Sequence, residues 1–139
     1  MQMKCCQMKG DLHMSKTAII TGGSRGLGAA MTMKLGELGY NVVINYRSES
    51  SKALTDEAVE KLKSEYGVDA IAVKADVSKY EDCERLVQAA IDKFGDKIDV
   101  VVNNAGITNN CNFIDLQPEQ YTRGLSRQTF SVCSTSIIL

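Results

Sequence analysis

The feature that most constrains this chain is the regular alternation of short runs rich in Val and Ile with longer amphipathic segments. Four of the short runs have the length and apolar character of buried strands: Thr17–Thr21, Asn41–Asn45, Ala70–Lys74 and Ile98–Asn103. Three helical patterns separate these runs, and each pattern is followed directly by a glycine. Because parallel strands joined by helices form right-handed crossovers, this order predicts an α/β fold built on one parallel sheet.

The third helical pattern is the clearest, since apolar residues recur at three- and four-residue steps from Lys79 to Phe94. Ser78 and Glu81 have the spacing of a capping box, which predicts that both side chains cap the start of this helix. Gly95 is placed to close the helix in a left-handed conformation. The second helical pattern is expected to bury one stripe of side chains, made of Leu54, Ala58, Val59 and Leu62.

The composition is that of one folded domain, because 44% of the 139 residues are hydrophobic and the net charge is only −1. This balance argues against nucleic acid or an anionic membrane as the main partner, since both bind basic surfaces. The apolar runs are too short to span a bilayer. Lys4, Lys9 and Asp11 interrupt the N-terminal segment, which therefore lacks the apolar core of a signal peptide. We expect a cytoplasmic protein.

The cysteines form neither a disulfide framework nor a metal site by their spacing. They are Cys5, Cys6, Cys83, Cys111 and Cys133. Their number is odd, their spacing is irregular and no Cys-x-x-Cys occurs. Cys5 and Cys6 lie near His13, but within a Met-rich stretch without periodicity. We therefore expect thiols in a reducing compartment and no bound metal.

Two segments fall outside the strand and helix pattern. Residues 1–14 hold four of the six methionines without any periodicity, and we expect a disordered leader. Residues 124–139 are rich in Ser and Thr and have no helical or strand pattern, which predicts a divergent tail. The folded domain is expected to span residues 15–123.

A glycine-rich loop, Thr21-Gly22-Gly23-Ser24-Arg25-Gly26-Leu27-Gly28, lies between the first predicted strand and the first predicted helix. Glycines at this place let the backbone turn sharply and approach a pyrophosphate, which then binds at the helix N-terminus. A P-loop is excluded, because Ala29 and Ala30 stand where that motif requires Lys and then Ser or Thr. The spacing is Gly-x-x-x-Gly-x-Gly, which differs from the usual Gly-x-Gly-x-x-Gly of dinucleotide sites.

Two further motifs lie at the ends of predicted strands: Asp76-Val77 after the third, and Asn103-Asn104-Ala105-Gly106 at the fourth. With the glycine-rich loop, they make the chain resemble the short-chain dehydrogenase/reductase family from Lys16 to Arg123. Within that family, its sequence is most similar to the β-ketoacyl-acyl-carrier-protein reductases. The resemblance implies a Rossmann-like, doubly wound parallel sheet, of which this chain holds the N-terminal part with about four strands and three to four helices.

The resemblance also implies contacts with a dinucleotide at these strand ends. The loop from Gly22 to Gly28 would bind the phosphates. Asp76 would recognise the adenine amino group with the Val77 backbone beside it, although an aspartate at a strand end can equally serve a turn. Asn103 would brace the sheet. The ribose next to the nicotinamide would be lined by Asn104, Ala105 and Gly106.

Charge favours NADP(H) as the cofactor. An NAD enzyme places a carboxylate at the end of the second strand to hold the ribose 2′-hydroxyl. Here that stretch is Asn45-Tyr46-Arg47-Ser48, which contains no carboxylate before Glu49. Arg25 and Arg47 can both bind a 2′-phosphate, and Ser24 and Ser48 add hydroxyl donors. The alternative for Arg47 is a solvated loop residue. The predicted cofactor-binding residues are Gly22, Gly23, Ser24, Arg25, Gly26, Leu27, Gly28, Tyr46, Arg47, Ser48, Asp76, Val77, Asn104, Ala105 and Gly106.

The catalytic residues that the resemblance requires are not found in these 139 residues. Carbonyl reduction in the family needs a Ser, and a Tyr whose pKa is lowered by a Lys four positions later. No tyrosine of this sequence is followed by a lysine at that distance. The family pattern also breaks at Gly124-Leu125-Ser126-Arg127, so we expect a chain truncated after about Arg123. The DNA sequence downstream of codon 123 would test this expectation best.

Three interpretations of function stay open. The first is an NADP-dependent oxidoreductase that reduces a ketone or an acyl-thioester carbonyl, as in fatty acid biosynthesis, with a homo-oligomer expected for the full-length relatives. The second is a non-catalytic dinucleotide-binding fragment, because the Ser and Tyr-x-x-x-Lys segment is missing. The third is a misfolded product without a function of its own.

Overall fold

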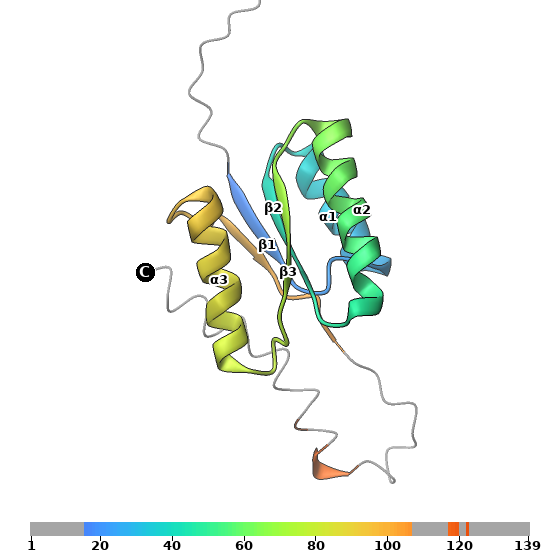
Figure 1. Ribbon diagram of the computed structural model, residues 1–139, viewed down its shortest axis with the longest axis vertical. Helices are drawn as coiled ribbons and strands as arrows, with labels where there is room; N and C mark the ends of the chain where they lie inside the picture. The colour runs from blue at the N-terminus through green and yellow to red at the C-terminus, as the bar shows by residue number, and fades with distance from the viewer. Residues whose placement is uncertain (1–15, 107–116, 120–121, 123–139) are drawn as a thin grey trace, which may run out of the picture.

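A computed structural model describes residues 16–106, 117–119 and 122, and in residues 16–106 four strands alternate with three helices (Figure 1). In chain order the elements are β1 (Thr17–Ile20), α1 (Gly26–Glu37), β2 (Asn41–Tyr46), α2 (Glu49–Tyr66), β3 (Ala70–Lys74), α3 (Tyr80–Phe94) and β4 (Val100–Val102). Each strand predicted from the sequence overlaps an observed strand, and its ends differ by at most two residues.

The four strands are parallel and lie in the order β3-β2-β1-β4. The chain therefore runs outward from β1 through β2 to β3, and then crosses back to place β4 on the other side of β1. At such a reversal the loops after neighbouring strands diverge, which leaves a crevice at the carboxyl ends of the strands. The predicted Rossmann-like parallel sheet is confirmed.

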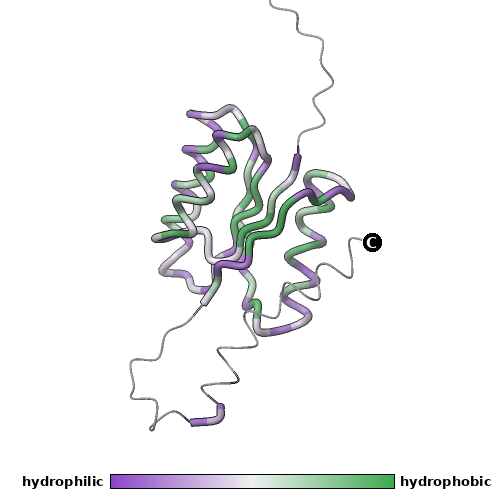
Figure 2. Tube along the Cα trace, turned by 180° about the vertical axis from the view of Figure 1, so that it is seen from behind, coloured by the Kyte–Doolittle hydropathy of each residue, from purple (hydrophilic) through white to green (hydrophobic). Residues whose placement is uncertain are grey.

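Helices cover both faces of the sheet, with α1 and α2 on one face and α3 on the other (Figure 1). Successive residues of the central strands point to opposite faces, so Ile19 and Val43 pack toward α3, whereas Ile20 and Ile44 pack toward α2. Figure 2 shows the strands as a hydrophobic centre between helices of mixed hydropathy. Burial on both faces explains why Ala18, Ile19 and Ile20 of β1 and Val42, Val43 and Ile44 of β2 are all apolar.

The capping box predicted from Ser78 and Glu81 is wrong. The helix α3 begins at Tyr80, and no side chain caps its first turn. The Ser78 hydroxyl donates instead to Asp76 Oδ1 over 2.7 Å, and Asp82 Oδ2 accepts a hydrogen bond of 2.7 Å from the Asp76 N–H. Because Asp76 turns the chain just before the helix, it engages the hydroxyl that the capping box needs.

The stripe predicted for α2 is correct except at Leu54, whose residue surface is 44% exposed. The buried face runs instead through Ser51 and Thr55 to Ala58, Val59 and Leu62. Two polar residues can be buried there because their hydroxyls are paired. The Thr55 hydroxyl donates to the Ser51 carbonyl over 2.7 Å, and the Ser51 hydroxyl lies 3.1 Å from that of Ser48.

The glycines after the helices have positive φ angles, as the sequence predicts. Gly67 is left-handed, with φ 66° and ψ 17°. Gly95 differs, because its φ of 97° is combined with an extended ψ of 175°. Its N–H still donates to the Ile91 carbonyl over 2.8 Å, and the extended ψ then directs the chain toward β4.

Several predictions fall outside the described residues, namely those for segments 1–14 and 124–139 and for Cys5, Cys6, His13, Cys111 and Cys133. Cys83 is buried, with its Sγ 3.4 Å from the Val77 carbonyl oxygen. The part of the chain that the structure describes contains no group of His, Cys, Asp and Glu arranged to hold a metal ion. Nor does any helix in that part have the length and apolar character to cross a membrane.

Candidate functional site

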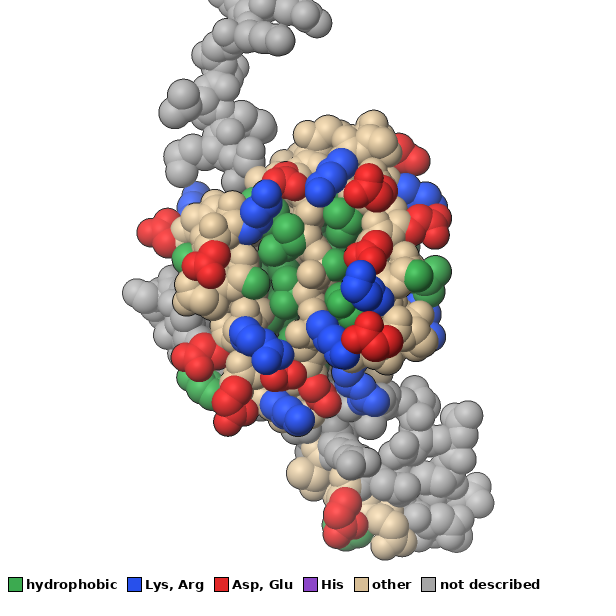
Figure 3. Space-filling model, in the orientation of Figure 1, with side chains coloured by type: hydrophobic (Ala, Val, Ile, Leu, Met, Phe, Trp, Pro, Cys, Tyr) green, Lys and Arg blue, Asp and Glu red, His purple; other side chains and the backbone are tan. Residues whose placement is uncertain are grey.

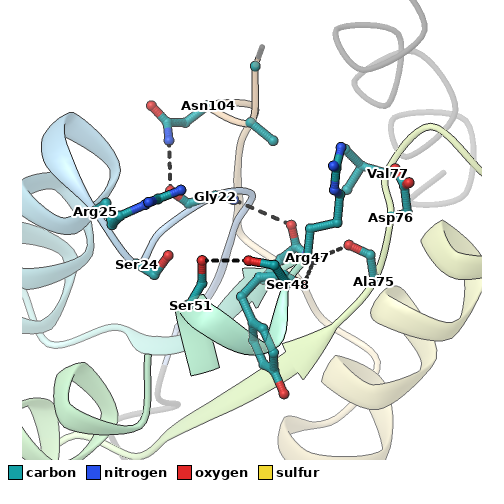
Figure 4. A pocket seen from close by; sticks show the side chains of 14 residues that line it. Gly22, Ser24, Arg25, Arg47, Ser48, Ser51, Ala75, Asp76, Val77 and Asn104 are labelled. Carbon is teal, nitrogen blue, oxygen red and sulfur yellow. Dashed lines mark hydrogen bonds between the residues drawn. The ribbon is translucent and has the colours of Figure 1, made fainter. Parts of the chain in front are cut away.

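A cavity of about 360 Å³ lies at the carboxyl ends of the strands, where the chain reverses its direction across the sheet. The predicted residues that line it are Gly22, Ser24, Arg25, Tyr46, Arg47, Ser48, Asp76, Val77, Asn104, Ala105 and Gly106. They come from the ends of all four strands and from the first turns that follow them (Figure 4). The structure thus brings together three motifs that are far apart in the sequence.

Gly22 begins the glycine-rich loop and needs to be a glycine for two reasons. Its φ is +65°, which disfavours any side chain. In addition, a Cβ at this position would lie 3.1 Å from Ala105 Cα, so the loop could not approach the end of β4 so closely. The resulting contact places the β1 loop and the β4 loop on adjacent walls of the cavity.

Four predicted residues of the same loop do not line the cavity: Gly23, Gly26, Leu27 and Gly28. A Cβ on Gly23 would lie 2.8 Å from Thr32 Oγ1 and 2.9 Å from Ile44 Cγ2, so this glycine lets the loop pack onto the core. The Thr32 hydroxyl donates to the Gly23 and Gly28 carbonyls over 3.1 and 2.9 Å. Leu27 is 72% exposed. Gly23 and Gly28 therefore shape the loop rather than the cavity wall.

Asn104, rather than Asn103, braces the sheet. Its Nδ2 donates to the carbonyls of Thr21 and Gly22, both over 3.1 Å. The Thr21 hydroxyl accepts from the N–H groups of Asn104 and Ala105 over 3.0 Å each. The role predicted for Asn103 is wrong because β4 ends one residue earlier, which leaves Asn103 exposed while Asn104 turns toward the glycine-rich loop.

Two arginines give the cavity its positive charge. Arg25 immediately precedes α1, and Arg47 immediately follows β2, so they reach the cavity from different walls (Figure 4). Neither of them takes part in any ion pair among the described residues. The first turn of α1 contains no acidic residue, and no side chain caps its N-terminus. An anion at this helix end would therefore meet amide dipoles and guanidinium groups together.

The carboxylate that follows β2 most closely is held away from the cavity. Glu49 forms an ion pair with Lys74 at the end of β3 and does not line the cavity. The hydrogen bond and charge of Lys74 lower the pKa of Glu49, and Glu49 raises the pKa of Lys74 in return. Glu49 is therefore paired with Lys74 and with neither arginine of the cavity.

Asp76 both lies beside the cavity and holds a turn, the two alternatives that the sequence leaves open for it. It lines the cavity, and its Oδ1 also accepts hydrogen bonds from the Ser78 N–H and hydroxyl over 3.1 and 2.7 Å. The turn therefore fixes the orientation of the carboxylate beside the cavity. A turn role and a ligand role are compatible at this residue.

Three residues that line the cavity are absent from the prediction: Asn45, Ser51 and Ala75. Only Asn45 could have been suspected from the sequence, since it is an amide that follows the apolar run Val42-Val43-Ile44 at the carboxyl end of a predicted strand. Ser51 and Ala75 have ordinary surroundings in the sequence. Their position depends on how α2 and β3 are placed relative to β1, which no local pattern specifies.

Comparison with known proteins agrees with this geometry. A family model described as short chain dehydrogenase matches residues 16–138. A protein named 3-oxoacyl-[acyl-carrier-protein] reductase FabG, from Staphylococcus epidermidis, is 40% identical over 70% of this chain and 38% of its own length. A short-chain dehydrogenase/reductase named FrzI, from a Cladobotryum species, is 42% identical over 79% of this chain and 41% of its own.

Solved structures show the same arrangement. A blue fluorescent protein from a metagenomic library, in complex with NADPH, superposes with a TM-score of 0.76 at 32% identity, over 88% of this chain and 48% of its own. An alcohol dehydrogenase from Thermococcus sibiricus, complexed with 5-hydroxy-NADP, superposes with a TM-score of 0.76 at 31% identity. The match covers 89% of this chain and 51% of that protein. This chain thus spans well under half of the curated relatives' length and about half of these two structures. From the fold, the motifs and these matches together, the chain belongs to the short-chain dehydrogenase/reductase family.

Proposed function

We propose that the cavity binds NADP(H), and that the chemistry to which this chain contributes is the NADP-dependent reduction of a ketone, as in 3-oxoacyl-[acyl-carrier-protein] reductases. The preference for NADP(H) over NAD(H) rests on the two arginines that line the cavity, together with the ion pair between Glu49 and Lys74. The names of two similar structures support it, since both proteins were solved with NADPH or an NADP analogue.

Each wall of the cavity has a distinct part in this binding. The Gly22 loop and the N-terminus of α1 would hold the pyrophosphate, because amide N–H groups and the helix dipole favour an anion there. Arg47 and Ser48 would bind the 2′-phosphate by charge-assisted hydrogen bonds. Asp76 would accept from the adenine amino group, and residues 104–106 would line the second ribose. When bound, NADPH supplies the hydride that reduces the carbonyl carbon.

The test is a calorimetric comparison of NADPH with NADH. The unaltered chain is expected to bind NADPH more tightly than NADH. Arg47→Asp should weaken NADPH binding by about 1–3 kcal/mol, which is the range for a lost charge-assisted hydrogen bond, and should affect NADH binding less. Lys34→Asp makes the same change of charge at the opposite end of α1, where Lys34 pairs with Glu37, and should leave both affinities unchanged. Equal affinities for the two cofactors would contradict the proposal.

A second candidate is binding of the dinucleotide without chemistry, favoured by one observation on the sequence. The residues four positions after Tyr40, Tyr46, Tyr66, Tyr80 and Tyr121 are Ile44, Ser50, Ala70, Glu84 and Leu125. These 139 residues therefore offer no Tyr-x-x-x-Lys proton donor, and general acid catalysis typically contributes about 10²–10⁴-fold.

This candidate predicts that the purified 139-residue chain binds NADPH but does not oxidise it with acetoacetyl thioesters or simple ketones. Loss of absorbance at the nicotinamide band measures turnover, and titration of the same sample measures binding. Turnover above the uncatalysed rate that disappears in Gly26→Trp would exclude the non-catalytic candidate.

The cytoplasmic location and the homo-oligomer of the full-length relatives stay predictions.

A further inference from the structure

One amide side chain is buried at the carboxyl edge of the sheet. Asn45 lies near the end of β2, lines the cavity and is only 2% exposed. Burying an amide costs free energy unless its donors and its acceptor are paired. Val43, which shares its face of β2, is fully buried in the hydrophobic core, so Asn45 is a polar side chain beside apolar ones.

The Asn45 amide joins segments that are distant in the sequence. Its Oδ1 accepts a hydrogen bond of 3.3 Å from the Gly22 N–H. Its Nδ2 donates to the Ala75 carbonyl over 2.9 Å, with longer bonds to the carbonyls of Tyr46 at 3.3 Å and Val73 at 3.4 Å. Figure 4 draws the bonds that reach Gly22 and Ala75 as dashed lines. One side chain therefore connects the loop after β1 with the end of β3.

We propose that Asn45 is a positioning residue that fixes the distance between the glycine-rich loop and the turn at Asp76, and thereby preorganises the cavity for a dinucleotide. This role rests on the proposed function, in which Gly22 contacts the pyrophosphate and Asp76, next to Ala75, contacts the adenine. A ligand that reaches both parts binds more tightly when their separation is already set. A ligand that reaches only one part gains little from it.

The same strand offers a matched control. Asn41 is an asparagine at the opposite end of β2, outside the cavity, and its Oδ1 accepts a hydrogen bond of 3.0 Å from the Asp69 N–H. It therefore also joins β2 to the start of β3, through a comparable bond. Removing it should lower the melting temperature without changing the affinity for any ligand of the cavity.

The experiment compares the binding of NADPH with that of adenosine 2′-monophosphate, which has the adenine and the 2′-phosphate but no pyrophosphate. Both are titrated into the unaltered chain, Asn45→Ala and Asn41→Ala, at a temperature at which circular dichroism shows each protein folded. We expect Asn45→Ala to weaken NADPH binding about tenfold or more, the effect of losing a buried hydrogen-bond network, and adenosine 2′-monophosphate binding less than about threefold. Asn41→Ala should change neither affinity.

Other outcomes overturn the role of Asn45. Equal weakening of both ligands, or a lower melting temperature with unchanged affinities, would make Asn45 a purely structural residue. If the unaltered chain does not bind NADPH, the proposed function fails and this role fails with it, whereas binding without a selective loss rejects the role alone. Should Asn45→Ala not fold, Asn45→Thr suits a strand and has one short hydroxyl that cannot span Gly22 and Ala75, so the same criteria apply to it.

Discussion

Gly28 lies in the first turn of α1, where the missing side chain leaves room for the loop that precedes the helix. A Cβ there would lie 2.5 Å from Asn104 Nδ2 and closer still to the Gly22 carbonyl oxygen. Those two atoms are hydrogen-bonded to each other over 3.1 Å. A single glycine therefore allows the helix, the glycine-rich loop and the end of β4 to meet at one point.

Gly28→Ala is expected to destabilise the fold, although Ala is the better helix former. Helix propensity favours Ala by about 1 kcal/mol, but an extra methyl group in a packed site costs about 1–3 kcal/mol, and here it meets backbone that cannot turn aside. We expect a net loss of about 1 kcal/mol in urea denaturation, together with weaker NADPH binding.

Gly39→Ala is the control for this substitution. A Cβ on Gly39 would meet nothing within 4 Å, so only the strain of its φ of +83° remains. It should lower stability without changing NADPH affinity. A Gly28→Ala protein with the stability and affinity of the unaltered chain would show that the loop can move away from α1.

At the scale of the elements, Asp99 links the starts of two neighbouring strands. Its Oδ2 accepts a hydrogen bond of 2.9 Å from the Thr17 N–H, and its own N–H donates to the Thr17 carbonyl over 2.9 Å. Lys97 Nζ lies 3.3 Å from the other carboxylate oxygen. The bond from Thr17, and then Lys97, lower the pKa of Asp99 below its ordinary value of 3.8.

A lowered carboxyl pKa stabilises the folded state above the unfolded-state value, and this contribution is lost as the pH falls through the lower folded-state value. Asp99→Asn should therefore cost about 1 kcal/mol at pH 7, and it should flatten the decline of stability below about pH 4. Urea denaturation at a series of pH values measures both effects. Asp96→Asn, exposed in the same loop, should change neither, and an unchanged pH profile for Asp99→Asn would disprove the link.

The elements could be predicted from the sequence because their patterns are local. Buried strands such as Asn41–Tyr46 follow from short runs rich in Val and Ile, and α3 follows from its apolar residues at three- and four-residue steps. Ser78 could not be placed, because Asp76 competes for the hydroxyl that would cap the helix. The exposure of Leu54 and the positions of Asn45 and Ser51 in the cavity wall could not be predicted either. They depend on how the helices pack across the strands, which is a property of the tertiary structure.

The same distinction holds for the site. The glycine-rich loop and the segments after β2, β3 and β4 could be predicted to meet, since all lie at carboxyl ends of parallel strands. Which loop residues face the cavity could not, because Gly23 and Gly28 are needed for packing against Thr32 and Asn104. The exchange of roles between Asn103 and Asn104 depends on the exact residue at which β4 ends.

For the molecule as a whole, the two outer strands of the sheet differ in how their edges are protected. On the β3 side, Asp69 pairs with Lys93 over 2.9 Å, and Arg85 donates to the Lys74 carbonyl over 3.4 Å. Figure 3 shows charged side chains around the hydrophobic ones on the face that carries β3. The segment Val100–Val102 has no charged residue, and among the described strands β4 pairs only with β1. An edge strand that has neither charged residues nor a partner strand on its outer side can pair with another chain.

We therefore expect the 139-residue chain to self-associate through β4 at low micromolar concentration. Ile91 and Phe94 of α3 are only half-buried and add apolar surface on the same molecule. Size-exclusion chromatography with light scattering measures the mass, and Val100→Lys, which places a charge on the edge, should raise the fraction of the 15.2 kDa monomer. Gln88→Lys adds the same charge on the exposed face of α3 and should not. A clean monomer with a cooperative thermal transition in the unaltered chain would instead show that residues outside the described part cover the edge of β4.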